Sequence, residues 1–265
     1  MIATRVLSAI PFAPRADRLV ERNVMNYRRT WLVLVSGFFE PLFYLLGIGF
    51  GIGALVGTVT GPDGQAIPYS VFVAPGLLAS SAMNGAIYDS TFNIFFKLRY
   101  AKLYDAVLST PLGINDIAVG EITWALIRGT LYAIGFLAVM LVLGLARSPW
   151  VILSLPAALL IGFAFAAVGM AATTYVRSWT DFDYIFVITL PLFLFSSTFF
   201  PLDVYPEPLR TLIALTPLSR SIDLLRSLSL GQISPILLVD IAYLLIMGAI
   251  GMTVVSRRLD KLLLK

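Results

Sequence analysis

The 265-residue chain contains neither cysteine nor histidine, and only 13% of its residues are charged. The absence of cysteine excludes disulfides, thiolate nucleophiles and Cys-ligated zinc or iron–sulfur sites. The absence of histidine excludes an imidazole base and an axial haem histidine. Any metal or acid–base chemistry would therefore depend on carboxylates, lysine or tyrosine.

The composition is that of a membrane protein. Hydrophobic residues make up 58% of the chain, and the mean hydropathy is +0.89. An ordinary soluble domain carries about 25% charged residues, so too little polar surface remains here to cover a water-soluble globule. We expect a single transmembrane domain over residues 1–265.

Six hydrophobic stretches are each long enough, at about 20 residues, to cross a bilayer as helices. They cover residues 31–53, 69–96, 117–145, 149–176, 184–201 and 235–256. Asn115 is expected to cap the third of them. The sequence therefore predicts an all-α integral membrane protein with six transmembrane helices.

Three further segments are predicted to form helices outside the spans. Residues 16–29 carry apolar side chains at three- and four-residue steps between charged ones, which predicts an amphipathic interface helix. Residues 97–110 predict a second amphipathic helix, on the cytoplasmic side. Prolines at 206, 208 and 217 divide residues 203–231 into an outer helical hairpin. The connection at residues 58–68 is expected to be an exposed turn.

The distribution of lysine and arginine orients the chain. Fourteen of these residues fall on the side that holds both ends of the chain, and four on the opposite side. The positive-inside rule then places both termini in the cytoplasm. The same rule accounts for the net charge of +4 without nucleic acid as a partner.

Five charged residues fall inside the predicted spans, at positions 40, 89, 121, 128 and 240. Each costs about 2.5 to 3.5 kcal/mol to insert, so each is expected to face a partner. Such residues either line a substrate or proton pathway or lock helices together as ion pairs. Both interpretations stay open for Glu40 and Asp89. For Glu121 and Arg128, which are two helical turns apart and poorly placed to pair with each other, the structural interpretation is favoured.

Aromatic residues cluster in the second and fifth spans. They could line a cavity for an apolar or amphiphilic cargo, although such stripes also serve as packing or interfacial anchors. With the polar residues nearby, they give the following candidate pathway: Glu40, Asn84, Asp89, Phe92, Phe195 and Phe199. The sequence has no Gly-x-x-x-x-Gly-Lys-Ser/Thr loop, so any ATP-derived energy must come from another polypeptide.

Several short strings, in this order and spacing, resemble the membrane subunit of type-2 ABC exporters, in the branch that includes nodulation exporter permeases and antibiotic-resistance permeases. The strings are Arg29-Thr-Trp31 leading to Phe39-Glu-Pro41, residues 72–78 continuing to Ala82-Met-Asn84, residues 102–112, and Phe199-Phe-Pro-Leu202 followed by Thr216-Pro-Leu218. One departure is Ser219-Arg220, where related permeases often have Tyr-His.

The resemblance implies a permease in a bacterial or archaeal cell membrane that dimerises as identical or related chains among membrane lipids. It implies no cofactor in this chain, with ATP and magnesium bound by separate ATP-binding subunits on the cytoplasmic face. The residues expected to couple the chain to those subunits are Arg18, Arg22, Arg99, Tyr100, Leu103, Tyr104 and Leu108. Tyr104 and Leu108 are the hypothesised anchors. The cargo would be amphiphilic, lipid-linked or drug-like.

Two other functions are considered. A self-contained secondary transporter is expected to contain inverted repeats, and residues 30–145 show no convincing similarity to residues 149–256. A membrane enzyme that modifies lipids would need clustered carboxylates for a metal, and the only close pair in a loop is Asp181 with Asp183. The chain is therefore expected to be a transport subunit and not an enzyme.

Overall fold

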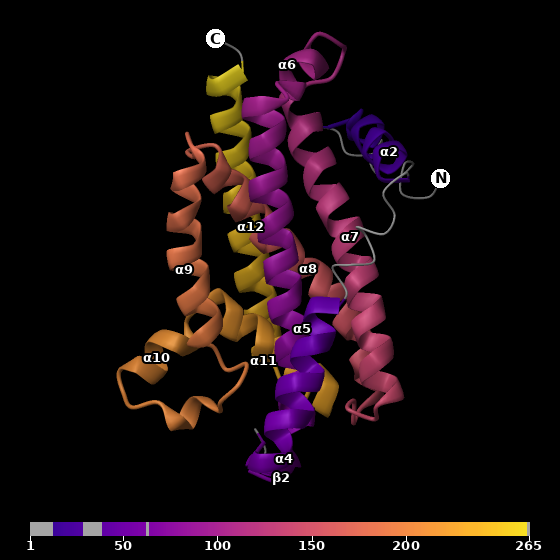
Figure 1. Ribbon diagram of the computed structural model, residues 1–265. Helices are drawn as coiled ribbons and strands as arrows, with labels where there is room; N and C mark the ends of the chain where they lie inside the picture. Colours follow the sequence, from indigo (N-terminus) through magenta and orange to yellow (C-terminus); the bar gives the residue numbers. More distant parts are fainter. Residues whose placement is uncertain (1–12, 29–38, 62–63, 264–265) are drawn as a thin grey trace.

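Long helices lie side by side along one axis in the computed structural model (Figure 1), which describes residues 13–28, 39–61 and 64–263. Within these residues, five helical stretches are long and apolar enough to cross a membrane. They are Phe39–Val56, Tyr69–Tyr100, Ile114–Val142, Pro149–Thr173 and Ile236–Leu263.

Helix α8 (Ser154–Thr173) lies at the centre of the bundle. Helices α5 (Tyr69–Tyr88), α7 (Ile114–Val142) and α12 (Ile236–Leu263) all pack against it. Small residues allow the closest approach: a Cβ atom at Gly251 of α12 would lie 2.7 Å from the backbone carbonyl carbon of Ala167 on α8. In lipid, where the hydrophobic effect does not drive helices together, such close backbone contact is what holds them.

The start of α7 shows how local sequence sets a helix end. The backbone N–H of Gly113 donates to the Asp116 carboxylate at 2.8 Å, so the helix begins at Ile114. The prediction of Asn115 as the cap is therefore wrong. Its side chain instead accepts a hydrogen bond from the Ser256 hydroxyl of α12 at 2.9 Å.

The helix at Phe39–Val56 covers the later part of the predicted first span; residues 31–38 lie outside the described residues. It contains a π-helical stretch (Leu45–Ile52) and ends in α4 (Gly53–Val56). The expected turn at residues 58–68 contains a small antiparallel hairpin of β1 (Thr58–Thr60) and β2 (Ala66–Pro68).

The predicted fifth span, residues 184–201, is shorter in the structure. Helix α9 runs from Phe182 to Leu194, and its 13 residues measure about 20 Å at 1.5 Å each, less than the roughly 30 Å of a bilayer core. After Leu194 the chain bends toward α5, where the hydroxyl oxygens of Thr198 and Ser80 lie 3.2 Å apart. A count of six transmembrane helices therefore stays a prediction.

The segment predicted as one helix over residues 97–110 is divided in two. The long helix that begins as α5 continues through π-helical turns to Tyr100. The chain then breaks at Lys102, whose φ of 44° lies in the left-handed region, before the short helix α6 (Leu103–Leu108). Arg99 and Tyr100 thus belong to the end of the long helix and not to α6.

Helix α2 (Ala16–Tyr27) lies beside the α6 end of α7 (Figure 1). Its buried face includes Leu19, and a Cβ atom at Gly120 of α7 would lie 2.8 Å from the Leu19 Cβ. At the other end of the bundle, α9 is followed by η7 (Leu202–Val204), α10 (Leu209–Ala214) and α11 (Pro217–Leu230).

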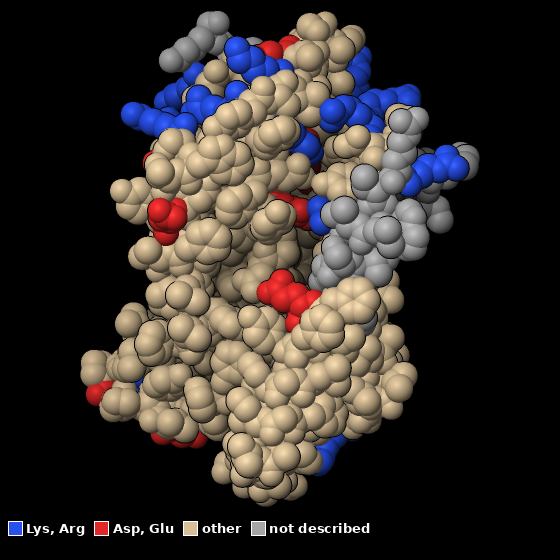
Figure 2. All heavy atoms as spheres, viewed as in Figure 1, with Lys and Arg blue, Asp and Glu red and all other residues tan. Residues whose placement is uncertain are grey.

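The molecular surface is divided by charge. Lysine and arginine gather at the end that holds α6 and the C-terminal part of α12, and a broad belt with few charged residues follows (Figure 2). Large apolar side chains are exposed over the helices, including Leu55 at 89% and Val142 at 85%. A bilayer would cover such a surface.

Candidate functional site

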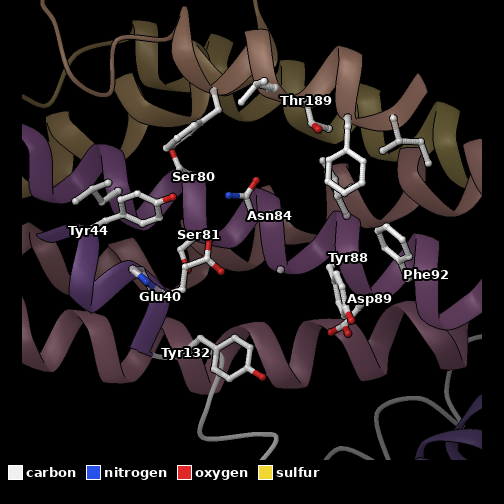
Figure 3. Close-up of a pocket in the computed structure, with 18 of the residues that line it drawn as sticks. Glu40, Tyr44, Ser80, Ser81, Asn84, Tyr88, Asp89, Phe92, Tyr132 and Thr189 are labelled. Atoms are coloured by element: carbon white, nitrogen blue, oxygen red, sulfur yellow. The ribbon is translucent and has the colours of Figure 1, made fainter. Parts of the chain in front are cut away.

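A groove with a volume of about 710 Å³ lies between the Phe39–Val56 helix, α5, α7 and α9 (Figure 3). Its size is within the range of about 300 to 1,000 Å³ that is typical of pockets for small molecules. The groove follows the long helix Tyr69–Tyr100 from Leu77 to Phe92, which is the middle part of that helix. It is therefore a cavity at membrane depth.

Polar side chains from all four sides line this groove. Glu40 and Ser81 lie near one end, Asn84 points into the middle, and Tyr132 and Thr189 approach from opposite walls (Figure 3). A membrane helix surface that faced lipid alone would not collect carboxyl, amide and hydroxyl groups in this way. The lining can form hydrogen bonds with a guest molecule.

A buried ion pair lies on the wall of the groove. Arg128 of α7 and Asp89, directly after α5, are 2.7 Å apart and are 8% and 7% exposed. The Arg128 guanidinium also donates to the hydroxyls of Tyr132, at 3.1 Å, and Tyr27, at 3.4 Å. Because Tyr27 belongs to α2, this one arginine connects three elements.

The other end of the groove is aromatic. The rings of Phe92 and Phe182 are stacked with their centroids 4.2 Å apart, and Phe186 lies 6.0 Å from Phe92. Phe193 lines the groove elsewhere, near Tyr44, with the two ring centroids 6.2 Å apart. These rings give the cavity an apolar surface next to its polar one.

Four of the six predicted pathway residues line the groove, namely Glu40, Asn84, Asp89 and Phe92. The other two do not. Phe195 lies beyond the end of α9 and is 49% exposed, and Phe199 packs edge-on against Phe193 with centroids 5.2 Å apart. Sequence reasoning missed Ser80, Ser81 and Thr189, because single hydroxyl residues within apolar runs give no distinct signal.

A second buried cluster lies nearer the charged end of the molecule. The Lys97 ammonium is 2.6 Å from a Glu121 carboxylate oxygen, and the Asn23 amide donates to the same oxygen at 3.3 Å. The three residues come from the end of the long α5 helix, from α7 and from α2, and we call them the junction. The sequence predicts Lys97 in the cytoplasmic helix over residues 97–110 and predicts that Glu121 needs a partner, but it does not predict that these two residues meet.

Helix α6 packs directly beside the junction. Tyr104 is 0% exposed, and Val107 is also buried, whereas Asp105 and Ala106 are exposed. Burial, with the negative charge of Glu121 as the next cause, holds the pKa of the Tyr104 hydroxyl well above its ordinary value. The hypothesis that Tyr104 is an external anchor needs correction, because its side chain contacts this chain.

The remaining predicted coupling residues lie in separate places. Arg18 pairs with Glu21 at 3.1 Å on the exposed side of α2, and Arg22 is exposed on the same helix. Arg99 donates to the Val176 carbonyl at 3.4 Å, and Tyr100 stacks on Trp179 at 5.6 Å. Leu103 and Leu108 are half-buried on α6.

Of the two carboxylates considered for a metal, Asp183 is exposed in the first turn of α9, and Asp181 has a structural role before that helix. Asp181 accepts hydrogen bonds from the backbone N–H groups of Arg177 and Ser178, and these bonds lower the pKa of Asp181. Across residues 13–28, 39–61 and 64–263, no three histidine, cysteine or acidic residues gather as a metal site would require.

Comparison with known proteins supports the resemblance. Residues 17–230 match the ABC-2 type transporter family. This chain belongs to that family. It is 34% identical to nodulation protein J of Rhizobium leguminosarum bv. trifolii over 213 residues, which cover 80% of this chain and 79% of the relative. Nodulation protein J of bv. viciae is 33% identical, with 80% of each chain covered. The protein of that name from Azorhizobium caulinodans is 26% identical, with 91% and 95% covered.

The chain is thus a membrane component of an ABC-2 transporter, with several apolar helices, and the matched region contains both the groove and the junction. Ser219 and Arg220 follow the Thr216-Pro-Leu218 string in α11. Arg220 of α11 forms an ion pair with Asp240 of α12 at 3.2 Å. This ion pair connects two helices.

Proposed function

We propose that the chain is the membrane-spanning permease of an ATP-driven exporter, and that an amphiphilic cargo passes through the groove. The observation that carries this proposal is the cavity itself: about 710 Å³ at membrane depth, with polar and aromatic walls side by side. An amphiphile needs both kinds of surface, because its polar head needs hydrogen bonds and its apolar part needs exclusion of water.

ATP hydrolysis takes place in a separate subunit, docked on the end of the permease that carries α2 and α6. The exposed residues of α6, Asp105 and Ala106, form the contact, with Arg18 and Arg22 of α2 beside them. On the opposite face of α6, the buried side chains of Tyr104 and Val107 pack against the rest of the permease. This end faces the cytoplasm because lysine and arginine gather there (Figure 2).

The junction connects α6 mechanically to the groove. Lys97 and Asp89 lie on the same continuous helix, eight residues apart, so a force applied at Lys97 acts along the helix that forms one wall of the cavity. A movement of α6 by the ATP-binding subunit therefore tilts this wall relative to α9. The complete exporter contains a second permease copy, identical or related, and lies in the cell membrane among lipids.

The proposal is tested by purification of the tagged permease from its native host in mild detergent, followed by mass spectrometry. A stoichiometric ATPase with a P-loop is expected. The permease with Ala106→Glu should lose this ATPase, because the substitution places a charge on the exposed face of α6. Val204→Glu is the matched control, since Val204 is 67% exposed in a short helix at the opposite end.

Either of two results would overturn the proposal. The first is a wild-type permease that copurifies with no ATPase and still transports, which would indicate a secondary transporter. The second is equal retention of the ATPase by Ala106→Glu and Val204→Glu, which would show that α6 is not part of the docking surface.

A further inference from the structure

The charged residues of the spans divide into two groups. Asp89 pairs with Arg128 at 2.7 Å, Glu121 with Lys97 at 2.6 Å, and Asp240 with Arg220 at 3.2 Å. Glu40 differs: in the part of the chain that the structure describes, its carboxylate has neither an ion pair nor a hydrogen bond. A charge at membrane depth without a partner in its own chain is a candidate for binding a ligand.

Glu40 is placed to meet a guest molecule. It lies at the rim of the groove next to Ser81, with Asn84 one turn further along α5 (Figure 3). These neighbours are uncharged. The groove therefore contains two carboxylates, of Glu40 and Asp89, and one guanidinium, of Arg128, which leaves a net charge of −1.

The positive charge of Arg128 is already compensated by a residue of this chain. Its guanidinium contacts Asp89 and the hydroxyls of Tyr27 and Tyr132, and it lies 5.2 Å from the Tyr27 ring centroid. An anionic ligand would have to compete with Asp89 for this group and would also be repelled by Glu40. A cationic ligand meets neither obstacle.

We propose that the groove selects a cationic amphiphile, with its ammonium or other cationic group beside Glu40 and its apolar body against the rings of Phe92 and Phe186. This inference rests on the proposed function, and it names the class of cargo. Tyr44 and Tyr132 lie on the Glu40 side of the groove, and aromatic faces also attract cations. The carboxylate supplies the charge, and the rings supply a surface that excludes water.

The test uses the full permease in nanodiscs of zwitterionic lipid and two fluorescent probes of the same length. Dansylcadaverine carries a terminal ammonium, and N-hexyl dansylamide carries a methyl group at the same position. Wild-type permease should bind the cationic probe about tenfold more tightly, which corresponds to one charge-assisted contact. In Glu40→Gln this preference should disappear, with binding of the neutral probe unchanged.

Two variants control for folding and for surface charge. Glu40→Asp keeps the charge and should keep the preference. Glu207→Gln removes a carboxylate that is 62% exposed at the far end of the molecule, outside the groove, and should bind both probes as wild type does. Equal binding of the two probes by wild type, or an undiminished preference in Glu40→Gln, would overturn the inference.

The outcome is independent of the ATPase, because the permease is measured alone. A permease that binds its ATPase but shows no cation preference would refute the cationic cargo and leave the exporter standing. A cation preference that depends on Glu40, in a permease that copurifies with no ATPase, would support the cationic cargo and refute the ATP-driven exporter.

Discussion

Arg128 shows most directly how this permease keeps charge within an apolar bundle. Its guanidinium bonds to Asp89 and to two tyrosine hydroxyls from α2 and α7. Removing one partner from a buried ion pair costs about 3 to 5 kcal/mol, chiefly because the other charge is left uncompensated. The pair is therefore a condition for stability, whatever it contributes to transport.

The first prediction follows from this asymmetry. Arg128→Met should lower the free energy of unfolding by about 3 kcal/mol, because Asp89 remains buried without a counter-charge. Adding Asp89→Asn should recover most of this loss, because the second change removes the stranded charge. Unfolding in increasing SDS, monitored by tryptophan fluorescence, measures both variants. Equal stability of the single and double variants would show that the pair does not act as a unit.

Asn23 gives a second prediction at the same scale. It is 1% exposed, and its amide is the contact by which α2 reaches the buried Lys97–Glu121 pair. Asn23→Ala removes a hydrogen bond to a charged group, worth about 1.5 to 3 kcal/mol, so opening of α2 should become about ten to one hundred times more frequent. Amide hydrogen exchange along α2 measures this, with α7 as the internal reference.

The matched control for this variant is Asn26→Ala. Asn26 is exposed on the same helix and has the same intrinsic helix propensity. Its replacement should leave exchange on α2 within about twofold of wild type. Similar acceleration by both variants would mean that the effect does not come from the contact of Asn23 with the buried pair, and the junction would lose its proposed role.

At the scale of elements, close packing of α12 on α8 depends on a residue without a side chain. At Gly251 a Cβ atom would lie 2.7 Å from the Ala167 carbonyl carbon and 2.9 Å from the Val168 nitrogen. These are backbone atoms of a central helix and cannot turn aside as a side chain could. Gly251→Ala should therefore destabilise the bundle by about 1 to 3 kcal/mol through overpacking.

Gly129 provides the comparison, because nothing lies within 4 Å of a Cβ atom placed there. Gly129→Ala should stabilise α7 by about 0.5 to 1 kcal/mol, since alanine is the better helix former. Thermal unfolding of the two variants in one detergent should thus shift in opposite directions. A shift in the same direction for both would contradict the assigned helix contact.

The sequence predicts elements where the physical signal is local. Long apolar runs mark the helices, and the need of each buried charge for a partner anticipates the pairs of Glu121 and Arg128. It does not predict that α9 ends at Leu194, because the bend that follows brings Thr198 into contact with Ser80, which is distant in the sequence. It does not predict the division of residues 97–110, because the left-handed φ of Lys102 has no signature in residue type.

The same limit applies to the groove. Composition identified Glu40, Asn84, Asp89 and Phe92, since polar and aromatic residues within spans attract notice. It also selected Phe195 and Phe199, because chemical type alone cannot say which face of a helix a ring occupies. Tertiary packing decides that point, and it places both rings outside the cavity lining.

At the scale of the whole molecule, one end is rich in lysine and arginine and the other is not (Figure 2). From this asymmetry the positive-inside rule predicts an orientation, with α6 in the cytoplasm and the segment from η7 to α11 outside. The chain has no cysteine, so a single introduced cysteine reports its own position without background. The orientation can therefore be measured on the otherwise unchanged protein.

The last prediction uses this property with two positions at opposite ends of the bundle. Val204→Cys, at a residue that is 67% exposed, should react with a membrane-impermeant maleimide in intact cells, or in spheroplasts if an outer membrane is present. Ala106→Cys, on the exposed face of α6, should react only after the membrane is permeabilised. A cysteine-free wild type gives the baseline. Reversed labelling would place α6 outside, where no cytoplasmic ATPase could reach it, and would refute both the orientation and the proposed docking surface.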